Sequence, residues 1–189
     1  MFRSVILLLI GLVSVCVGSD TVVTFNEIHY HSVEANDSEW VELHNQMSMR
    51  VDLSGWRLSG GIDFDFPEGT VIPSKGHLIV QGPGLPLPLS VGPFGGHLDN
   101  AGDSIILRDR NDRVMDRLEY RDELPWPIGP DGSGMTLTKH RPSLDTAESE
   151  SWGTSMNAGG TPGAANGLVM AFGELILSEV LAGAVELHN

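Results

Sequence analysis

The stretch VDLSGWRLSGGIDFDFPEGTVIP, residues 51–73, alternates short apolar runs with glycine and proline turns. Within it, IDFDF (residues 62–66) has an apolar residue at every second position and aspartate between them. A strand with this sequence would have one apolar face and one acidic face. Leu53, Trp56 and Leu58 flank a Ser-Gly turn and supply a large indole and two aliphatic side chains for a core. This pattern is typical of short strands joined by tight turns.

The same organisation continues from about residue 20 to residue 140. Short apolar-rich segments are separated by Gly, Pro, Asn or Asp, and the apolar spacing of a helix is not sustained anywhere in this range. The predicted strands are Thr21–His29, Glu39–Asn45, Trp56–Gly60, Ile62–Phe66, His77–Gln81, Ser104–Asp109, Val114–Tyr120 and Met135–His140. Eight such segments predict an all-β sandwich.

Two connections add to this prediction. The turn Arg110-Asn111-Asp112 supplies residues that tolerate left-handed backbone conformations, which predicts a β-hairpin. The segment Gly82–Leu98 has too many prolines for an interior strand, so we expect a long, extended surface loop there.

The first residues have the features of an export signal. Arg3 is followed by the apolar run Val5–Val13 and by small residues up to Gly18, which predicts a secretory signal peptide over residues 1–18. A stable membrane span would need about 20 apolar residues, so none is expected. The only cysteine, Cys16, lies in this segment, and lipid attachment there is the alternative reading. Export without cysteine in the mature chain favours a secreted or cell-surface protein of bacterial type.

The charge is strongly acidic. The net charge is −14, and removal of Arg3 with the signal peptide gives −14 − 1 = −15. The 11 basic residues are scattered along the sequence and outnumbered by 25 acidic ones, so nucleic acid is not an expected partner. The acidity fits a solvated exported surface or a surface that collects divalent cations.

The segment SMNAGGTPGAANG (Ser155–Gly167), which we call the closing segment, is small, polar and turn-rich. We expect it to end a domain that spans residues 20–167. The sequence VELHN of Val41–Asn45 then recurs at Val185–Asn189, and LSEV precedes the second copy much as FNEI precedes the first. Residues 168–189 are therefore predicted to be the truncated start of a second repeat, with a shorter first loop.

Several motifs, taken in order, resemble one family. They are NEIHY, EWVELHN, VDLSGWRLSGGIDFDFPEGTVIPSKGHLIV, GGHLDNAGDSIILRD, VMDRLEY, PWP, DGSGMTL, SW and GGTPGAAN. The chain closely resembles the lamin-tail domain in its bacterial, exported form, over roughly Thr21–Asn166. The most specific stretches are LSGWRLSGG, the following FPEGTVIP and the closing GGTPGAAN.

The resemblance implies an immunoglobulin-like β-sandwich that serves as an accessory module. Such modules occur in exported multi-domain chains, near nucleases, phosphatases or spore-coat-type kinases. The nuclear role of the fold does not transfer, because the sequence has no rod, no nuclear signal and no basic patch. The residues that carry the resemblance are Asn26, Glu27, Glu42, Asn45, Leu53, Gly55, Trp56, Pro67, Gly69, Trp126, Trp152, Gly160, Pro162 and Asn166. Most of them have a structural reading, so the fold alone says little about the ligand.

Some of these residues also fit chemical roles. Glu27, Glu39 and Glu42 come from strands expected to pair, and two suitably placed carboxylates can hydrolyse glycosides. The structural alternative is that Glu27 and Glu42 bind backbone amides or flank a strand end. Glycines 69 and 102 fit turn positions with positive φ.

Histidine and tryptophan offer two further sites. His29 and His31 would share one face of a strand, as metal ligands can, but a third ligand is not apparent and two exposed histidines are the alternative. Trp126 lies between two prolines, which predicts an extended backbone. Its indole is expected to cover an edge or end of the sandwich, and a platform for sugar stacking is the alternative.

Calcium is the other ionic candidate, because it takes carboxylate and carbonyl oxygens. The acidic clusters include Asp63 with Asp65 and Asp99 with Asp103. None matches an EF-hand loop, and aspartate is also an ordinary turn residue. The sequence contains no nucleophile elbow, Walker loop or dinucleotide-binding glycine motif.

The sequence therefore favours a non-catalytic exported adhesion or scaffolding module that binds protein or cell-surface polysaccharide, without a cofactor. One alternative is an exported hydrolase, or an accessory domain of a hydrolase or spore-coat-type kinase. A calcium-dependent adhesion module is the second alternative. The oligomeric state does not follow from these patterns.

Overall fold

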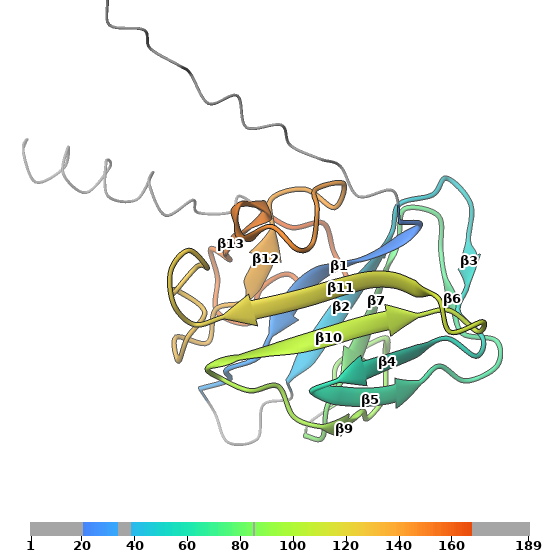
Figure 1. Ribbon diagram of the computed structural model, residues 1–189, viewed down its shortest axis with the longest axis horizontal. Helices are drawn as coiled ribbons and strands as arrows, with labels where there is room; N and C mark the ends of the chain where they lie inside the picture. The colour runs from blue at the N-terminus through green and yellow to red at the C-terminus, as the bar shows by residue number, and fades with distance from the viewer. Residues whose placement is uncertain (1–20, 34–38, 85, 168–189) are drawn as a thin grey trace, which may run out of the picture.

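A computed structural model of the chain describes residues 21–33, 39–84 and 86–167 (Figure 1). The strands form two large sheets packed face to face and a separate two-stranded ribbon, which confirms the predicted all-β sandwich. The predicted signal peptide over residues 1–18 and the predicted second repeat over residues 168–189 lie outside the described residues.

One sheet has six strands in the order β13-β12-β1-β2-β7-β8. Its members are β1 (Val23–His29), β2 (Trp40–Asn45), β7 (His77–Gln81), β8 (Ser90–Val91), β12 (Leu137–Lys139) and β13 (Trp152–Thr154). All neighbours are antiparallel except β7 and β8, which are parallel.

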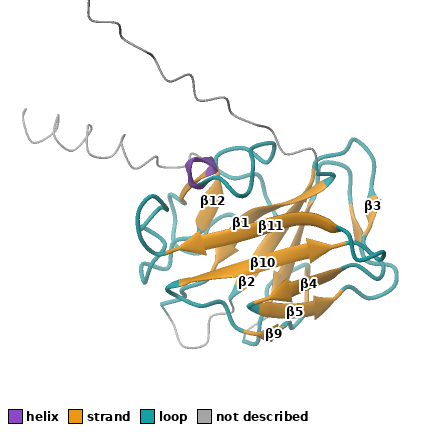
Figure 2. Ribbon diagram, in the orientation of Figure 1, coloured by secondary structure: helices purple, strands orange, loops and turns teal. Residues whose placement is uncertain are grey.

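The other sheet has five strands in the order β11-β10-β4-β5-β9. Its members are β4 (Arg57–Gly60), β5 (Ile62–Asp65), β9 (Gly95–Gly96), β10 (Gly102–Arg108) and β11 (Val114–Arg121). The strands β3 (Val51–Asp52) and β6 (Val71–Ile72) form the ribbon. In the part of the chain that is described, the only helical element is the short 3-10 turn η1 (Ser149–Ser151), and no helix is long and apolar enough to span a membrane (Figure 2).

The core lies between the two large sheets. Its fully buried members include Phe25 and Leu43 from the six-stranded sheet and Leu58, Ile105 and Leu118 from the five-stranded sheet. All seven residues of β1 and all six residues of β2 are buried, including the polar ones. Alternation along a strand normally leaves one face in water. Here a second layer must cover the outer face of the six-stranded sheet.

Each of the eight predicted segments contains a strand, with ends that shift by one or two residues. The hairpin prediction is confirmed, because β10 pairs with β11 and Asp112 adopts φ 65° in the turn. The acidic and apolar faces of IDFDF are also confirmed, since Ile62 and Phe66 are buried while Asp63 and Asp65 are exposed.

The prediction of an extended surface loop at Gly82–Leu98 is wrong in part. This segment contributes β8 and β9, and its Phe94 and Leu98 are buried in the core. Both strands are two residues long and lie at sheet edges. An edge strand forms backbone hydrogen bonds on one side only, so nearby prolines are tolerated there. Strands this short carry too little periodicity to be recognised in the sequence.

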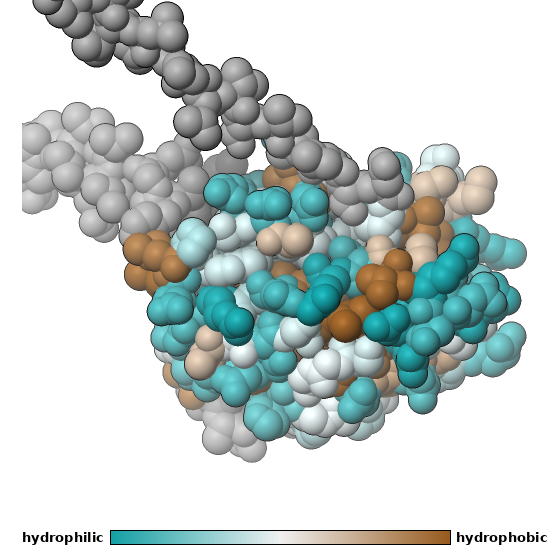
Figure 3. All heavy atoms as spheres, viewed as in Figure 1, coloured by the Kyte–Doolittle hydropathy of each residue, from teal (hydrophilic) through white to brown (hydrophobic). Residues whose placement is uncertain are grey.

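The basic residues are scattered along the sequence, but more than half of them come together on the outer face of the five-stranded sheet. Figure 3 shows this face, which is mostly hydrophilic with small hydrophobic patches. Six of the 11 basic residues lie on β4, β10, β11 and their hairpin turn: Arg57, Arg108, Arg110, Arg113, Arg117 and Arg121. Most of them face acidic neighbours, as in the pairs Arg57–Asp112, Arg113–Asp109 and Arg117–Glu119. The pairing balances the charge of this face.

Candidate functional site

Glu27 and Glu42 are directly opposite each other on β1 and β2, with side chains that are fully buried. A β-bulge between Phe25 and Glu27 shifts the register of β1 just before this pair. The bulge turns Glu27 toward the outer face of the sheet, where Glu42 also lies. The third carboxylate considered for catalysis, that of Glu39, instead accepts a hydrogen bond from Leu98 N at 2.8 Å.

Both carboxyl groups bind the closing segment. Glu27 accepts hydrogen bonds from Thr161 N at 3.1 Å, from Thr161 Oγ1 at 3.0 Å and from Thr136 Oγ1 at 2.5 Å. Glu42 accepts from Gly163 N at 2.6 Å and from Asn26 Nδ2 at 2.7 Å. These contacts hold the closing segment over β1 and β2, and it is the layer that buries their outer face.

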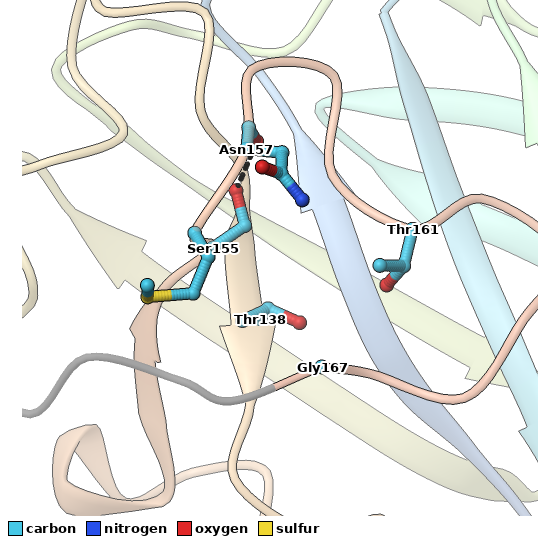
Figure 4. A pocket seen from close by; sticks show the side chains of 6 residues that line it. Thr138, Ser155, Asn157, Thr161 and Gly167 are labelled. Carbon is cyan, nitrogen blue, oxygen red and sulfur yellow. Dashed lines mark hydrogen bonds between the residues drawn. The ribbon is translucent and has the colours of Figure 1, made fainter.

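Figure 4 shows the closing segment crossing this face close to β12. Thr138, Ser155 and Thr161 line a cavity of about 20 Å³, and Ser155 Oγ donates to Asn157 O at 2.8 Å. A space of this size holds one water molecule at most. It offers no room for a substrate between the carboxyl groups and the closing segment.

Burial dominates the electrostatics of the pair. It raises the pKa of Glu27, against the hydrogen bonds from Thr136 and Thr161 that favour the charged form. It raises the pKa of Glu42 to about 8, against the hydrogen bonds from Asn26 and Gly163. A raised pKa is common at catalytic carboxyls. Here, however, the donors that bind the two carboxyl groups are backbone amides and side chains of the domain itself, from Asn26, Thr136, Thr161 and Gly163.

Asn26 and Asn166 extend the same contact. Asn26 Nδ2 donates to Asn166 Oδ1 at 2.9 Å, and Asn166 Nδ2 donates to Lys139 O at 2.8 Å. Gly160 lies against Glu27, since a Cβ there would be 2.1 Å from Glu27 Oε1. Pro162 is exposed beside Gly163. The motif GGTPGAAN is therefore the part of the closing segment that meets the two carboxyl groups.

Asn45, at the end of β2, organises a different loop. Its Nδ2 atom lies within hydrogen-bond distance of Met49 O (2.7 Å), Pro73 O (2.8 Å) and Ile72 O (3.2 Å), and its Oδ1 accepts from Met47 N. Met47 and Met49 are 38% and 64% exposed. A buried amide thus fixes a loop that presents two methionines to solvent.

The stretch around Trp56 forms the turn that joins the ribbon to β4. Leu53 and Trp56 lie in the core, and Gly55 adopts φ 70° between them. Ser54 Oγ accepts from the amide of Gly69, which has φ 84°, and Pro67 O accepts from Thr70 N. Gly102 has φ 129°, so the positive-φ predictions for Gly69 and Gly102 are confirmed.

A second buried polar cluster was not predicted. Lys139 Nζ, on the fully buried Lys139, donates to Thr24 Oγ1 and Thr146 Oγ1, both at 2.7 Å. Asp116 Oδ2 accepts from the same two hydroxyls and from Phe25 N, each at 2.8 Å. Burial lowers the pKa of Lys139 to about 8 and raises the pKa of Asp116. Thr24 and Asp116 are far in sequence from each other and from Lys139 and Thr146, so no local pattern signals the cluster.

The two histidines considered as metal ligands, His29 and His31, differ in burial and in partners. His29 is buried, with its ring 5.9 Å from Trp40, which contradicts the picture of two exposed histidines. His31 is half-buried and bonds Asp131 at 2.7 Å. His44 and His77 stack instead, with ring centroids 4.6 Å apart. In the described ranges, no group of three or more His, Cys, Asp or Glu is placed to hold a metal ion.

Of the four calcium candidates, Asp99 lies in a loop, Asp103 near the start of β10, and Asp63 and Asp65 on β5. Asp99 Oδ1 accepts from Ala101 N, and Asp103 Oδ1 accepts from Ser104 N. Asp63 and Asp65 are exposed on β5. The carboxyl groups that are bound here serve backbone amides, as aspartate does in ordinary turns.

Trp126 differs from its prediction in conformation. Its amide donates to Glu123 O at 3.0 Å in a turn, after a cis bond between Leu124 and Pro125, so the backbone is not extended. The indole is only 7% exposed, and its ring centroid lies 6.4 Å from that of Trp152. Trp126 borders a cleft of about 410 Å³ on β11, but too little of its ring is open for sugar stacking. Trp152 in turn donates from Nε1 to Thr146 O.

A family model described as Lamin Tail Domain matches residues 18–122, which is more than half of the chain. No curated protein matches the chain. The match ends before β12 and β13, although both strands continue the sheet that contains β1.

Proposed function

The chain belongs to the lamin-tail domain family, and from this premise we propose that it is a non-catalytic exported module that binds protein. Export follows from the predicted signal peptide over residues 1–18. The module reading is supported by the fold, an immunoglobulin-like β-sandwich whose buried carboxyl groups of Glu27, Glu42 and Asp116 bind its own backbone and side chains.

The kinds of hydrophobic side chain that are exposed favour one class of partner, protein or polysaccharide, over the other. All four tryptophans and both tyrosines are buried, with at most 7% of any of them exposed. The large hydrophobic side chains that are exposed in the described part are aliphatic or methionine, such as Met49, Leu89 and Leu124. Sugar recognition relies on accessible aromatic faces, whereas aliphatic and methionine side chains suit protein surfaces. This favours a protein partner over a polysaccharide.

The methionine loop is the surface we assign to this binding. Met47 and Met49 lie on the loop held by Asn45, and Val71 of the adjacent ribbon is 38% exposed. Lys75 N donates to Met47 O, and this bond holds the loop against the connection between β6 and β7. Methionine adapts its shape to different partners, so a rigidly anchored loop with two exposed methionines fits an adhesion or scaffolding role.

The test uses the full chain. We expect no turnover of model glycosides, phosphate esters or nucleic acids, no retention on purified polysaccharides, and retention on immobilised exported proteins of the producing cell. Replacing Met47 and Met49 by Ser should abolish the retention, while Val114→Ser, a change of an exposed residue on β11, should leave it unchanged. Turnover that disappears in a folded Glu27→Gln or Glu42→Gln variant would establish the hydrolase alternative. Retention on polysaccharide that survives the methionine changes would establish carbohydrate binding instead.

A further inference from the structure

Asn166 and Gly167 form the only Asn-Gly dipeptide in the sequence. The side-chain amide of an asparagine can be attacked by the backbone nitrogen of the next residue, and glycine hinders this attack least because it has no side chain. Gly167 is exposed, and a Cβ placed on it would meet nothing within 4 Å. The dipeptide therefore has the composition and the free space that deamidation requires.

The fold holds the side chain of Asn166 while the closing segment is docked. Ala164 and Ala165 are exposed, whereas Asn166 is half-buried. Its Nδ2 atom donates to Lys139 O at 2.8 Å and to Asn26 O at 3.2 Å, and its Oδ1 atom accepts from Asn26 Nδ2 at 2.9 Å. Deamidation turns the planar amide into a tetrahedral centre and expels Nδ2, so it cannot proceed without breaking these hydrogen bonds.

The hold on Asn166 is linked to the carboxyl groups that bind the closing segment. Asn26 is fully buried, and its Nδ2 atom also donates to Glu42 Oε1 at 2.7 Å. The other oxygen of Glu42 accepts from Gly163 N at 2.6 Å, three residues before Asn166. Opening of the closing segment would therefore release Gly163 and Asn166 together.

We propose that Asn166 is a deamidation site that the docked closing segment protects. When the segment opens, the nitrogen of Gly167 attacks the side-chain carbonyl carbon of Asn166. A bond forms between these two atoms, the bond from the carbon to Nδ2 breaks, and ammonia leaves with the proton of the Gly167 amide. Water then opens the five-membered imide and leaves aspartate or isoaspartate at this position. The site is separate from the methionine loop, so the inference does not depend on the proposed function.

The change is permanent, because the product cannot restore the contacts of the amide. A carboxylate has no hydrogen to donate, so the carbonyl oxygens of Lys139 and Asn26 would face a negatively charged oxygen. Two acceptors held this close without a hydrogen between them repel each other and destabilise the docked state. Deamidation thus converts a reversible opening of the closing segment into a lasting one.

The test follows the conversion of Asn166 to an acidic residue by peptide mass spectrometry, with the full chain incubated in mildly alkaline buffer. Folded wild-type protein is compared with the same protein unfolded in guanidinium chloride. If deamidation requires local opening, its rate in the folded protein is reduced to the open fraction of the unfolded rate. We expect it to be at least about 10-fold slower in the folded protein. In folded Glu42→Ala, which leaves the amide of Gly163 without its acceptor, it should be about 10-fold faster than in folded wild type.

Two variants serve as controls. Gly167→Val crowds the attacking nitrogen, and the open space around Gly167 means that the change should not impair folding. It should deamidate far more slowly than the wild type when both are unfolded. Val114→Ser, a change of an exposed residue on β11, should leave the rate in the folded protein unchanged. If Glu42→Ala does not fold, Thr161→Ala takes its place, since it removes only one hydroxyl donor to Glu27.

Equal rates in folded and unfolded wild type would overturn the protection, and so would equal rates in the folded wild type and the folded carboxyl-contact variant. The absence of deamidation in the unfolded chain would overturn the site itself. Asn166→Asp measures the consequence, and the amide of Gly163 should exchange about 10-fold faster in this variant than in the wild type. Unchanged exchange would contradict the lasting release of the closing segment.

Discussion

At the scale of single residues, buried charge is the main feature of this domain. Lys139 and Asp116 are linked through the hydroxyls of Thr24 and Thr146 rather than by direct contact. Removing one charged partner leaves the other buried without compensation, whereas removing both is far less costly. The Lys139 ammonium also lies 5.5 Å from the centroid of the Trp152 ring.

We predict that Lys139→Met lowers the free energy of unfolding by about 3 kcal/mol. The double variant Lys139→Met/Asp116→Leu should be less destabilised than the sum of the single changes. Urea denaturation of the four proteins measures the coupling. Arg50→Met, at an exposed basic residue, is the control and should change stability by less than about 0.5 kcal/mol. Additive effects would show that the two charges do not interact.

The pH dependence of stability should reveal His44. Burial, helped by the nearby charges of His77, Lys75 and Lys139, lowers its pKa from 6.5 to about 4. Between these values the unfolded chain binds a proton that the folded chain does not. Stability due to this histidine is therefore complete above pH 6.5 and is lost as the pH falls toward 4.

His44→Gln removes this titration. We expect the wild-type protein to lose about 2 kcal/mol more than the variant between pH 7 and pH 4, as measured by urea denaturation. The comparison cancels the opposite contribution of Glu42, whose raised pKa makes the folded state bind more protons over part of the same range. Parallel pH profiles for the two proteins would be inconsistent with a neutral, buried His44.

At the scale of elements, the closing segment completes the sandwich without being a strand. Gly160 has φ 63° and faces Glu27 and Thr136 so closely that a methyl group would overlap both. Gly159 has a similar φ of 76°, but a Cβ there would meet nothing within 4 Å. The two neighbours thus separate the effect of backbone strain from that of the Glu27 contact.

Gly159→Ala should cost about 1 kcal/mol, because alanine tolerates positive φ poorly. Gly160→Ala should cost about 3 kcal/mol, because it also displaces the closing segment from Glu27. Thermal or urea unfolding compares the two variants directly. Equal losses would mean that Glu27 does not fix the position of Gly160.

The strands that the sequence predicts are those with a clear pattern. The alternation in IDFDF and the turn residues before Val114 are local signals, and both correspond to observed elements. β8 and β9 have two residues each and depend on their neighbours in the sheet. The burial of Glu27 and Glu42 is likewise beyond local pattern, because the layer that covers them lies more than 100 residues away in sequence.

At the scale of the whole molecule, the domain has three layers, which are two sheets and the closing segment. The contacts of Glu27 and Glu42 join the third layer to the sandwich, so the carboxyl groups that resemble a catalytic pair have a structural role. The fold could be recognised from sequence motifs. The roles of Glu27 and Glu42 could not, because they depend on hydrogen bonds to residues far away in sequence. The binding surface that we propose, around Met47 and Met49, lies in a loop outside these layers.

Amide hydrogen exchange of Thr161 and Gly163 tests this structural role most directly. In the wild-type chain both amides donate to buried carboxyl oxygens, at 3.1 Å to Glu27 and 2.6 Å to Glu42. We predict slow exchange in the wild type. Gly163 in Glu42→Ala and Thr161 in Glu27→Ala should each exchange about 10-fold faster, since a buried amide left without its acceptor loses about 1 to 3 kcal/mol. The amide of Leu118 in the five-stranded sheet should not change. Exchange rates at Thr161 and Gly163 that are the same in all three proteins would contradict the account.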